Sequence, residues 1–260
     1  MPERRDWSRN ELLVALKLYC ELPFGKMHSR NPDIIRHAAM IGRTPSALAM
    51  KLTNFASLDP EIRSTGRKGL SGASQADRRI WDEMVSNWNR LAIEIAESDG
   101  SLEADYATLE KTTSEAIDED PTCYIGGTRE AVIEARIGQN FFRKAVLSAY
   151  EYKCCISGLA VSELLVASHI VPWRNDAENR LNPRNGLCLS AIHDRAFDLG
   201  LITVSENLRV VLSTKLKKMK ESRYIQETFV RYEDCEIQRP EKFSPHIDFL
   251  RHHRETTFVG

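Results

Sequence analysis

Four polar residues between positions 169 and 194 have types and spacing that suggest chemistry. His169 lies near the end of one apolar run, Asn185 precedes a second, and His193 and Asp194 follow that second run. A histidine with a pKa of about 6.5 can take a proton from water at neutral pH, as a general base does. A carboxylate oxygen is a suitable ligand for a hard divalent cation such as Mg²⁺. Together such groups meet the main requirements of phosphodiester hydrolysis, an activated water and a cation that neutralises developing charge.

Two short strands and a helix are expected to position these residues. The strands are predicted within residues 164–171 and 185–190, and the helix covers residues 191–199 and ends at Gly200. We also predict a helix and a short strand before them and a β-hairpin after them, at 141–150, 153–158 and 201–212.

The order of these elements resembles the HNH nuclease family and its ββα-metal motif, most of all the branch found in bacterial restriction-type proteins. The matching segments are Ala-Ser-His-Ile-Val-Pro-Trp, Asn-Pro-Arg-Asn-Gly and Ile-His-Asp-Arg-Ala-Phe-Asp, at 167–173, 182–186 and 192–198. The resemblance implies that His169 is the general base, that Asn185 orients the motif and that His193 is a metal ligand. Asp194 is our second candidate ligand. The resemblance also implies that the protein is a metal-dependent endonuclease that uses Mg²⁺, with Mn²⁺ or Ni²⁺ as alternatives.

Two departures from the family pattern bear on the metal. Many HNH enzymes have an Asp ligand directly before the base histidine, where this chain has Ser168. Many also bind a structural zinc through two C-x-x-C pairs, a spacing that none of the six cysteines here shows. We therefore expect no structural zinc, and expect metal binding to depend on His193, Asp194 or water.

The N-terminal part is predicted to be a helical domain with a helix-turn-helix pattern. Three helices are expected to begin after Ser8, Asn31 and Thr44, and a further helix covers residues 77–91. In that pattern the third helix would enter a DNA groove. The candidate DNA contacts on its exposed side are Arg43, Lys51 and Asn54. In the C-terminal part, the candidates for phosphate contact are Arg174, Arg184 and Lys217.

The charge balance suggests how the chain is divided. The sequence has 36 Lys and Arg against 37 Asp and Glu, a net charge of −1, which excludes a generally basic nucleic-acid coat protein. Acidic residues gather in 96–125, which we interpret as a linker between a helical domain, 1–95, and an α+β nuclease domain, 126–260. No apolar run approaches the roughly 20 residues of a membrane span, so we expect a cytoplasmic protein.

Three functions remain open from the sequence. The first is a metal-dependent DNA endonuclease in restriction or antiphage defence, including defence directed at modified DNA. It would act as a homodimer because a single ββα-metal site nicks one strand. The second, favoured by Ser168, is a non-catalytic DNA-binding regulator on an HNH scaffold. The third is a nuclease effector whose N-terminal domain is an interaction or sensing module.

Overall fold

The computed structural model describes residues 5–66, 72–98 and 129–260. The chain forms two compact units, Met1–Phe142 and Arg143–Gly260. Most of the predicted acidic linker, 96–125, lies outside the described residues. None of the helices in the described ranges is both long enough and apolar enough to cross a membrane.

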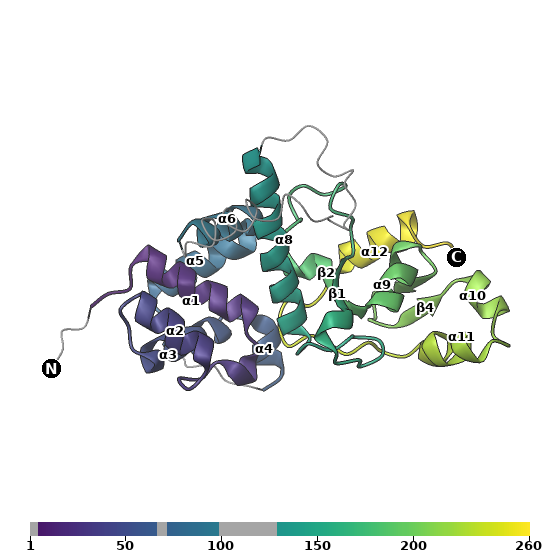
Figure 1. Ribbon diagram of the computed structural model, residues 1–260, viewed down its shortest axis with the longest axis horizontal. Coiled ribbons are helices and arrows are strands. Elements are labelled where there is room, and N and C mark those ends of the chain that lie inside the picture. Colours follow the sequence, from purple (N-terminus) through teal and green to yellow (C-terminus); the bar gives the residue numbers. More distant parts are fainter. Residues whose placement is uncertain (1–4, 67–71, 99–128) are drawn as a thin grey trace, which may run out of the picture. The chain divides into compact units, whose positions relative to one another are not determined.

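The first unit is helical (Figure 1). Its helices are α1 (Arg9–Glu21), α2 (Pro32–Met40), α3 (Pro45–Ala56), α4 (Pro60–Ser64), α5 (Gln75–Ser86) and α6 (Trp88–Ser98), with a short 3-10 turn, η1 (Phe24–Lys26). Helix α8 (Arg129–Ala149) contains the boundary between the units. The core of the first unit forms where α1 packs against α3, α5 and α6.

The predicted starts of the first three helices are confirmed. Ser8 and Glu11 form a capping box at α1, the Asn31 side chain accepts a hydrogen bond from the amide of Asp33, and the Thr44 hydroxyl accepts one from the amide of Ala47. Each cap satisfies an amide that the helix itself leaves without a partner.

The single helix predicted at 77–91 is wrong, because the chain forms α5 and α6 with a break at Asn87. Asn87 leaves the helical conformation, with φ of −154°. Its side-chain oxygen then accepts a hydrogen bond from the amide of Arg90 at 2.9 Å. Asn87 therefore starts a second helix, a role for which asparagine is well suited.

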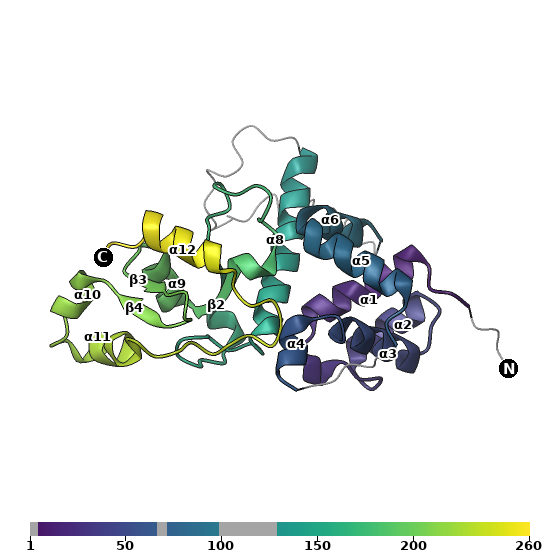
Figure 2. The same ribbon diagram turned by 180° about the vertical axis from the view of Figure 1, so that it is seen from behind.

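The second unit contains the predicted order of two strands and a helix (Figures 1 and 2). Strands β1 (Leu165–His169) and β2 (Gly186–Ser190) pair antiparallel, with His169 opposite Gly186. Helix α9 (Ala191–Asp198) follows β2 directly and packs on both strands. A second antiparallel pair, β3 (Ile202–Val204) and β4 (Val210–Leu212), confirms the predicted hairpin.

The short strand predicted at 153–158 is a compact turn instead. The amide of Cys154 donates to the carbonyl of Leu159 at 2.9 Å, and the amide of Gly158, with φ of 73°, donates to the carbonyl of Cys154 at 2.8 Å. The chain therefore reverses within this segment. The amide of Cys155 donates to the carbonyl of Cys188, which holds the turn against β2.

The second unit contains several further short elements. They are the 3-10 turns η3 (Ser162–Leu164), η4 (Pro183–Asn185) and η5 (Val230–Tyr232) and the helices α10 (Thr214–Lys218), α11 (Arg223–Thr228) and α12 (Ile247–Thr256). His253 of α12 stacks flat on Phe197 of α9, with ring centroids 3.7 Å apart. Its Nε2 donates to the carbonyl of Phe197 at 3.1 Å. Burial lowers the pKa of His253 to about 4, so the ring is neutral and acts as part of the core.

Candidate active site

His169 is held in the protonation state that a general base requires. The ring is half-buried at the end of β1, and its Nε2 lies 2.9 Å from the carbonyl oxygen of Arg180. Because a carbonyl only accepts hydrogen bonds, Nε2 carries the proton and the lone pair is on Nδ1. Burial also lowers the pKa of His169 below its usual value. The imidazole is therefore neutral at pH 7, with Nδ1 as its basic atom.

The loop that follows β1 fixes the orientation of this ring. Trp173 meets His169 edge to face, with ring centroids 5.7 Å apart. Arg180 donates from Nε to the carbonyl of Trp173 at 2.9 Å, and its guanidinium lies 5.4 Å from the centroid of the Trp173 ring. Arg180 thus contacts both ring residues. Sequence reasoning missed it, because only the folded loop brings its carbonyl back to His169.

The Asn185 side chain holds the backbone of the segment that follows His169. Its side-chain oxygen accepts from the amide of Val171 at 2.8 Å, and its amide nitrogen donates to the carbonyls of Val171 and Asn179 at 3.1 Å and 3.3 Å. The residue is buried. In the structure Asn185 is a positioning residue, which holds the segment after the histidine.

The acidic side of α9 faces β1 at Ser168. Ser168 is 3% exposed, and its hydroxyl makes no hydrogen bond of ideal geometry within the described residues, although it lies close enough to the Asp194 carboxyl to affect that group's pKa. Burial raises the pKa of Asp194, while the nearby Ser168 hydroxyl partly opposes that rise. The Ser168 hydroxyl and the Asp194 carboxyl therefore lie close together at this end of β1.

Asp198 lies one helical turn after Asp194. Residues four apart are neighbours on one helix face. Partial desolvation of its carboxyl, together with the negative charge of Asp194, raises the pKa of Asp198 to about 6. A cation between two such carboxylates would relieve their repulsion. The sequence analysis did not single out Asp198, although its spacing from Asp194 is a signal that could have found it.

His193 does not lie as a metal ligand would. The ring is 2% exposed; Nδ1 accepts a hydrogen bond from the Ser190 hydroxyl at 2.9 Å, and Nε2 donates to the carbonyl of Thr228 at 2.8 Å. The expectation that His193 binds metal therefore needs correction, because both ring nitrogens are engaged with protein groups.

The remaining groups fit a hard cation with an incomplete protein shell. Within the described part of the chain, no three His, Cys, Asp or Glu residues cluster in a way that could hold a metal ion. Asp194, Asp198 and Ser168 offer two carboxylates and one hydroxyl. Mg²⁺ is commonly bound by one or two carboxylates and completed by water and substrate phosphates, so this set suits Mg²⁺ better than a structural metal.

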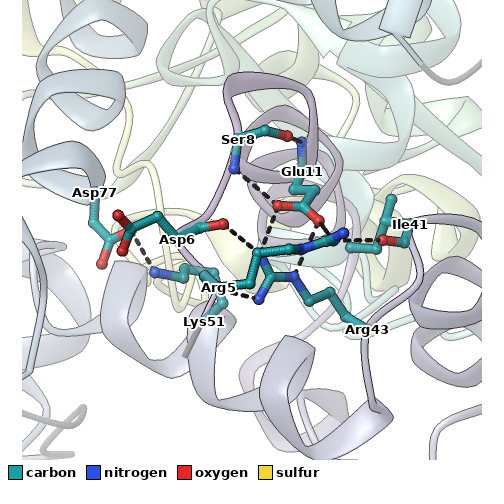
Figure 3. A network of polar contacts seen from close by, with 8 residues as sticks. All are labelled: Arg5, Asp6, Ser8, Glu11, Ile41, Arg43, Lys51 and Asp77. Carbon is teal, nitrogen blue, oxygen red and sulfur yellow. Dashed lines mark hydrogen bonds and ion pairs between the residues drawn. The ribbon is translucent and has the colours of Figure 1, made fainter. Parts of the chain in front are cut away.

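The three predicted DNA contacts of the first unit are turned inward, which corrects the expectation of an exposed side. Figure 3 shows two of them, Arg43 and Lys51. Arg43 forms an ion pair with Glu11 at 2.8 Å, and the guanidinium also donates to the carbonyls of Arg5 and Asp6. The hydrogen bond from Arg43 lowers the pKa of Glu11 to about 2.

Lys51 and Asn54 are also parts of the core. Lys51 is 6% exposed and pairs with Asp77 at 2.8 Å, and both Lys51 and Arg43 lie over the ring of Trp7. Asn54 is buried as well. Because these cations are neutralised within the unit, the structure does not confirm a DNA-reading helix-turn-helix.

The predicted phosphate contacts of the second unit are more accessible. Arg174 is exposed in the loop after β1, and Arg184 is half-buried in η4. Lys217 is exposed on α10 and pairs with Glu233 at 2.5 Å. These positions lie on three separate segments.

Comparison with known proteins identifies the segment that carries the site. Residues 154–205 match the family model described as HNH endonuclease. The match spans the turn at Cys154, both strands of the first pair, α9 and β3, so the C-terminal half of the chain contains an HNH domain. No curated protein matches the chain.

Proposed function

We propose that the HNH domain of this chain is a metal-dependent DNA endonuclease with His169 as its general base. An HNH domain indicates a nucleic-acid nuclease in general. The observation that carries the finer proposal is the neutral His169, whose Nε2 proton is committed to the carbonyl of Arg180. In this tautomer Nδ1 is the ring nitrogen that can accept a proton. The proton on Nε2 stays where it is.

The chain's own residues supply positioning and proton transfer. Nδ1 of His169 accepts the proton of the attacking water, while Asn185 and Trp173 keep the ring in place. Asp194 and Asp198, with Ser168, would hold a divalent cation, most simply Mg²⁺, with Mn²⁺ or Ni²⁺ as alternatives. When bound, the cation supplies charge neutralisation at the scissile phosphate.

Two arginines extend the proposed site toward the DNA. Arg174 lies in the loop after β1, and Arg184 directly precedes Asn185. We propose that both contact phosphates that flank the scissile bond. Guanidinium groups suit this role because they bind phosphate oxygens in a bidentate manner.

A plasmid assay tests the catalytic assignment. The protein is incubated with supercoiled plasmid and Mg²⁺, Mn²⁺ or Ni²⁺, and the wild type is compared with His169→Ala. General-base catalysis contributes roughly 10²- to 10⁴-fold, so the variant should lose about that much. Asn175→Ala, an exposed change in the same loop, is the matched control. Equal nicking by wild type and His169→Ala would overturn the assignment.

A non-catalytic DNA-binding regulator is the second candidate. Two observations favour it: Ser168 stands beside Asp194 without a carboxylate of its own, and the described residues contain no three-residue metal cluster. Ser168→Asp distinguishes the two functions. A wild type that binds DNA without cutting it, together with a Ser168→Asp variant that cuts, would establish the regulator. Cleavage by the wild type rejects it.

The biological role that we propose is restriction or antiphage defence in the cytoplasm, including action on modified DNA. The plasmid assay, repeated with methylated, unmethylated and phage DNA, tests this role. We also propose a homodimer for double-strand cleavage. Native mass measurement on a cognate duplex checks it, and a monomer would contradict it.

The first unit supports a variant of this proposal, in which it senses a signal or binds a protein. The inward-facing Arg43 and Lys51 favour that variant, because cations paired inside the unit are not available to phosphates. The control is Arg36→Gln, which removes a positive charge from an exposed position of the same unit. Substitutions at Arg43 and Lys51 that keep the unit folded should leave DNA affinity unchanged. If they lower DNA affinity while Arg36→Gln does not, the proposal that the first unit senses a signal or binds a protein is wrong.

A further inference from the structure

A basic segment follows the β3–β4 hairpin and contributes no residue to the proposed catalytic and metal-binding groups, although it contains Lys217 and the Thr228 carbonyl named above. It consists of residues 214–233, here called the basic arm, and contains α10, α11 and η5. The basic arm has six Lys and Arg residues against three Glu residues. Figures 1 and 2 both show α10 and α11 beyond β4, on the side of α9 away from β1 and β2.

Part of this positive charge is available to a partner. Two of the cations form ion pairs within the basic arm, Lys217 with Glu233 and Arg223 with Glu227. The other lysines are exposed, and none of them forms an ion pair with a residue in the described ranges: Lys215, Lys218 and Lys220. Three exposed lysines on one short segment give it a local positive charge that suits a polyanion such as a nucleic-acid backbone.

The two ends of the basic arm are attached to the hairpin. The amide of Ser213 donates to the carbonyl of Leu201, and the amide of Asp234 donates to the carbonyl of Val210, both at 2.9 Å. Leu216 and Phe229 bury their side chains. These contacts attach both ends of the basic arm and bury one side chain of α10 and one side chain directly after α11.

His193 contacts the C-terminal part of the basic arm. Its Nε2 donates to the carbonyl of Thr228, the last residue of α11, at 2.8 Å. The rings of Phe229 and Tyr232 meet the imidazole edge to face at 5.5 Å and 5.8 Å. The histidine of α9 therefore packs into the turn between α11 and η5.

The neighbouring position on α9 faces the candidate active site. Asp194 lies next to Ser168 of β1. At 3.6 residues per turn, consecutive side chains leave a helix about 100° apart. The same helix thus presents Asp194 to β1 and His193 to the basic arm. The position of α9 therefore determines where Asp194 and the basic arm lie relative to each other.

We propose that the basic arm contacts the phosphate backbone of duplex DNA and that His193 is a positioning residue which fixes the basic arm relative to α9. The proposal rests on the proposed function, because it assumes that DNA reaches α9. It gives His193 a role that does not require a metal. DNA held by the basic arm would be aligned with Asp194 by one rigid helix.

Salt-dependent binding tests the contact surface. The affinity of the full chain for a fluorescent duplex is measured by anisotropy in EDTA, so that no cleavage occurs. Each lost phosphate contact lowers the slope of log K against log salt by about 1. Replacing Lys215, Lys218 and Lys220 by Gln should therefore lower the slope by about 3. An unchanged slope overturns the contact surface.

A matched control removes the same charge from the first unit. Arg63, Arg78 and Arg79 are exposed there, and all three are replaced by Gln. We expect a smaller change in slope than for the lysine variant. A change as large as that of the lysine variant would show that total charge, and not the basic arm, governs binding, which would overturn the proposal.

A double-mutant cycle tests the positioning role. His193→Ala should weaken DNA binding, and the lysine substitutions should cost much less affinity in that background than in the wild type. His193→Gln, whose amide can both donate and accept, should restore part of the coupling. Trypsin should cut the basic arm faster in His193→Ala. Additive effects with unchanged trypsin cleavage would overturn the role of His193.

A second variant covers the case in which His193→Ala fails to fold. Tyr232→Leu removes an aromatic contact from the side of the basic arm and leaves α9 unaltered. In this variant too, the lysine substitutions should cost much less DNA affinity than they do in the wild type. If the effects of Tyr232→Leu and of the lysine substitutions simply add, the positioning role of His193 is overturned. Because binding is measured without a divalent cation, a protein that never cleaves DNA still yields a slope. Failure of the nuclease proposal is thus distinguishable from failure of this one.

Discussion

Asn185→Ala should strongly destabilise the HNH domain. The Asn185 side chain makes three hydrogen bonds in a buried place, two of them to the backbone of Val171. Alanine removes all three and leaves the amide and the carbonyl of Val171 without their partner. A buried polar group left unsatisfied costs about 1–3 kcal/mol, so two of them cost about 2–6 kcal/mol. A domain is typically stable by only 5–15 kcal/mol, about half of which this change could remove.

Thermal unfolding measures this loss. For a domain of this size, 1 kcal/mol shifts Tm by about 4 °C, so Tm of the unit should fall by roughly 8–24 °C. Asn175→Ala makes the same chemical change at an exposed position of the same loop. Surface changes of this kind usually stay within about 0.5 kcal/mol, and Tm of the control should move by no more than about 2 °C.

The result that would refute the reasoning is a pair of variants with the same Tm. It would mean that the backbone after His169 finds other partners when Asn185 is removed. Asn185→Asp adds a second check, because its carboxylate can accept from Val171 but cannot donate to the two carbonyls. Its Tm should also lie below that of the wild type, and a Tm equal to the wild-type value would show that the donated bonds contribute nothing.

Three further outcomes follow from the charges of the chain. Single-turnover cleavage should rise with pH and reach half of its maximum below pH 6.5, because burial lowers the pKa of His169; a rate still rising above pH 8 would contradict this. Burial raises the pKa of Asp59 to about 7, so the folded first unit keeps a proton that the unfolded chain releases near pH 3.9, and stability falls as pH rises between these values. Asp59→Asn should remove that fall in urea unfolding at pH 5 and pH 8, and an equally pH-dependent variant would exclude Asp59 as its source. Lys51→Ala should cost the first unit about 3–5 kcal/mol in the same assay, because it leaves Asp77 buried and unpaired; the exposed Lys26→Ala should cost almost nothing.

Local patterns predicted the elements well because their causes are local. Ser8, Asn31 and Thr44 start helices through hydrogen bonds that reach only two or three residues ahead. The order of β1, β2 and α9 follows in the same way from short apolar runs bounded by polar residues. Where a local cause was overlooked, as at the capping residue Asn87, the prediction merged two helices into one.

Side-chain environments were harder to predict because their causes are distant in the chain. Lys51 is buried by an ion pair with Asp77, 26 residues away. The ring of His193 is engaged by a carbonyl at position 228, 35 residues away. A motif names the residue types at a site, but the direction in which each one points depends on elements that the motif does not contain.

The stacking of His253 on Phe197 also bears on when the HNH domain is completed during translation. Phe197 leaves the ribosome 56 residues ahead of the histidine whose ring covers it and whose Nε2 binds its carbonyl. A nascent chain that stops before α12 contains β1, β2 and α9 but lacks His253, whose ring covers Phe197 of α9. A chain terminated before α12 would therefore carry the motif residues but leave one side of Phe197 on α9 without the ring that covers it.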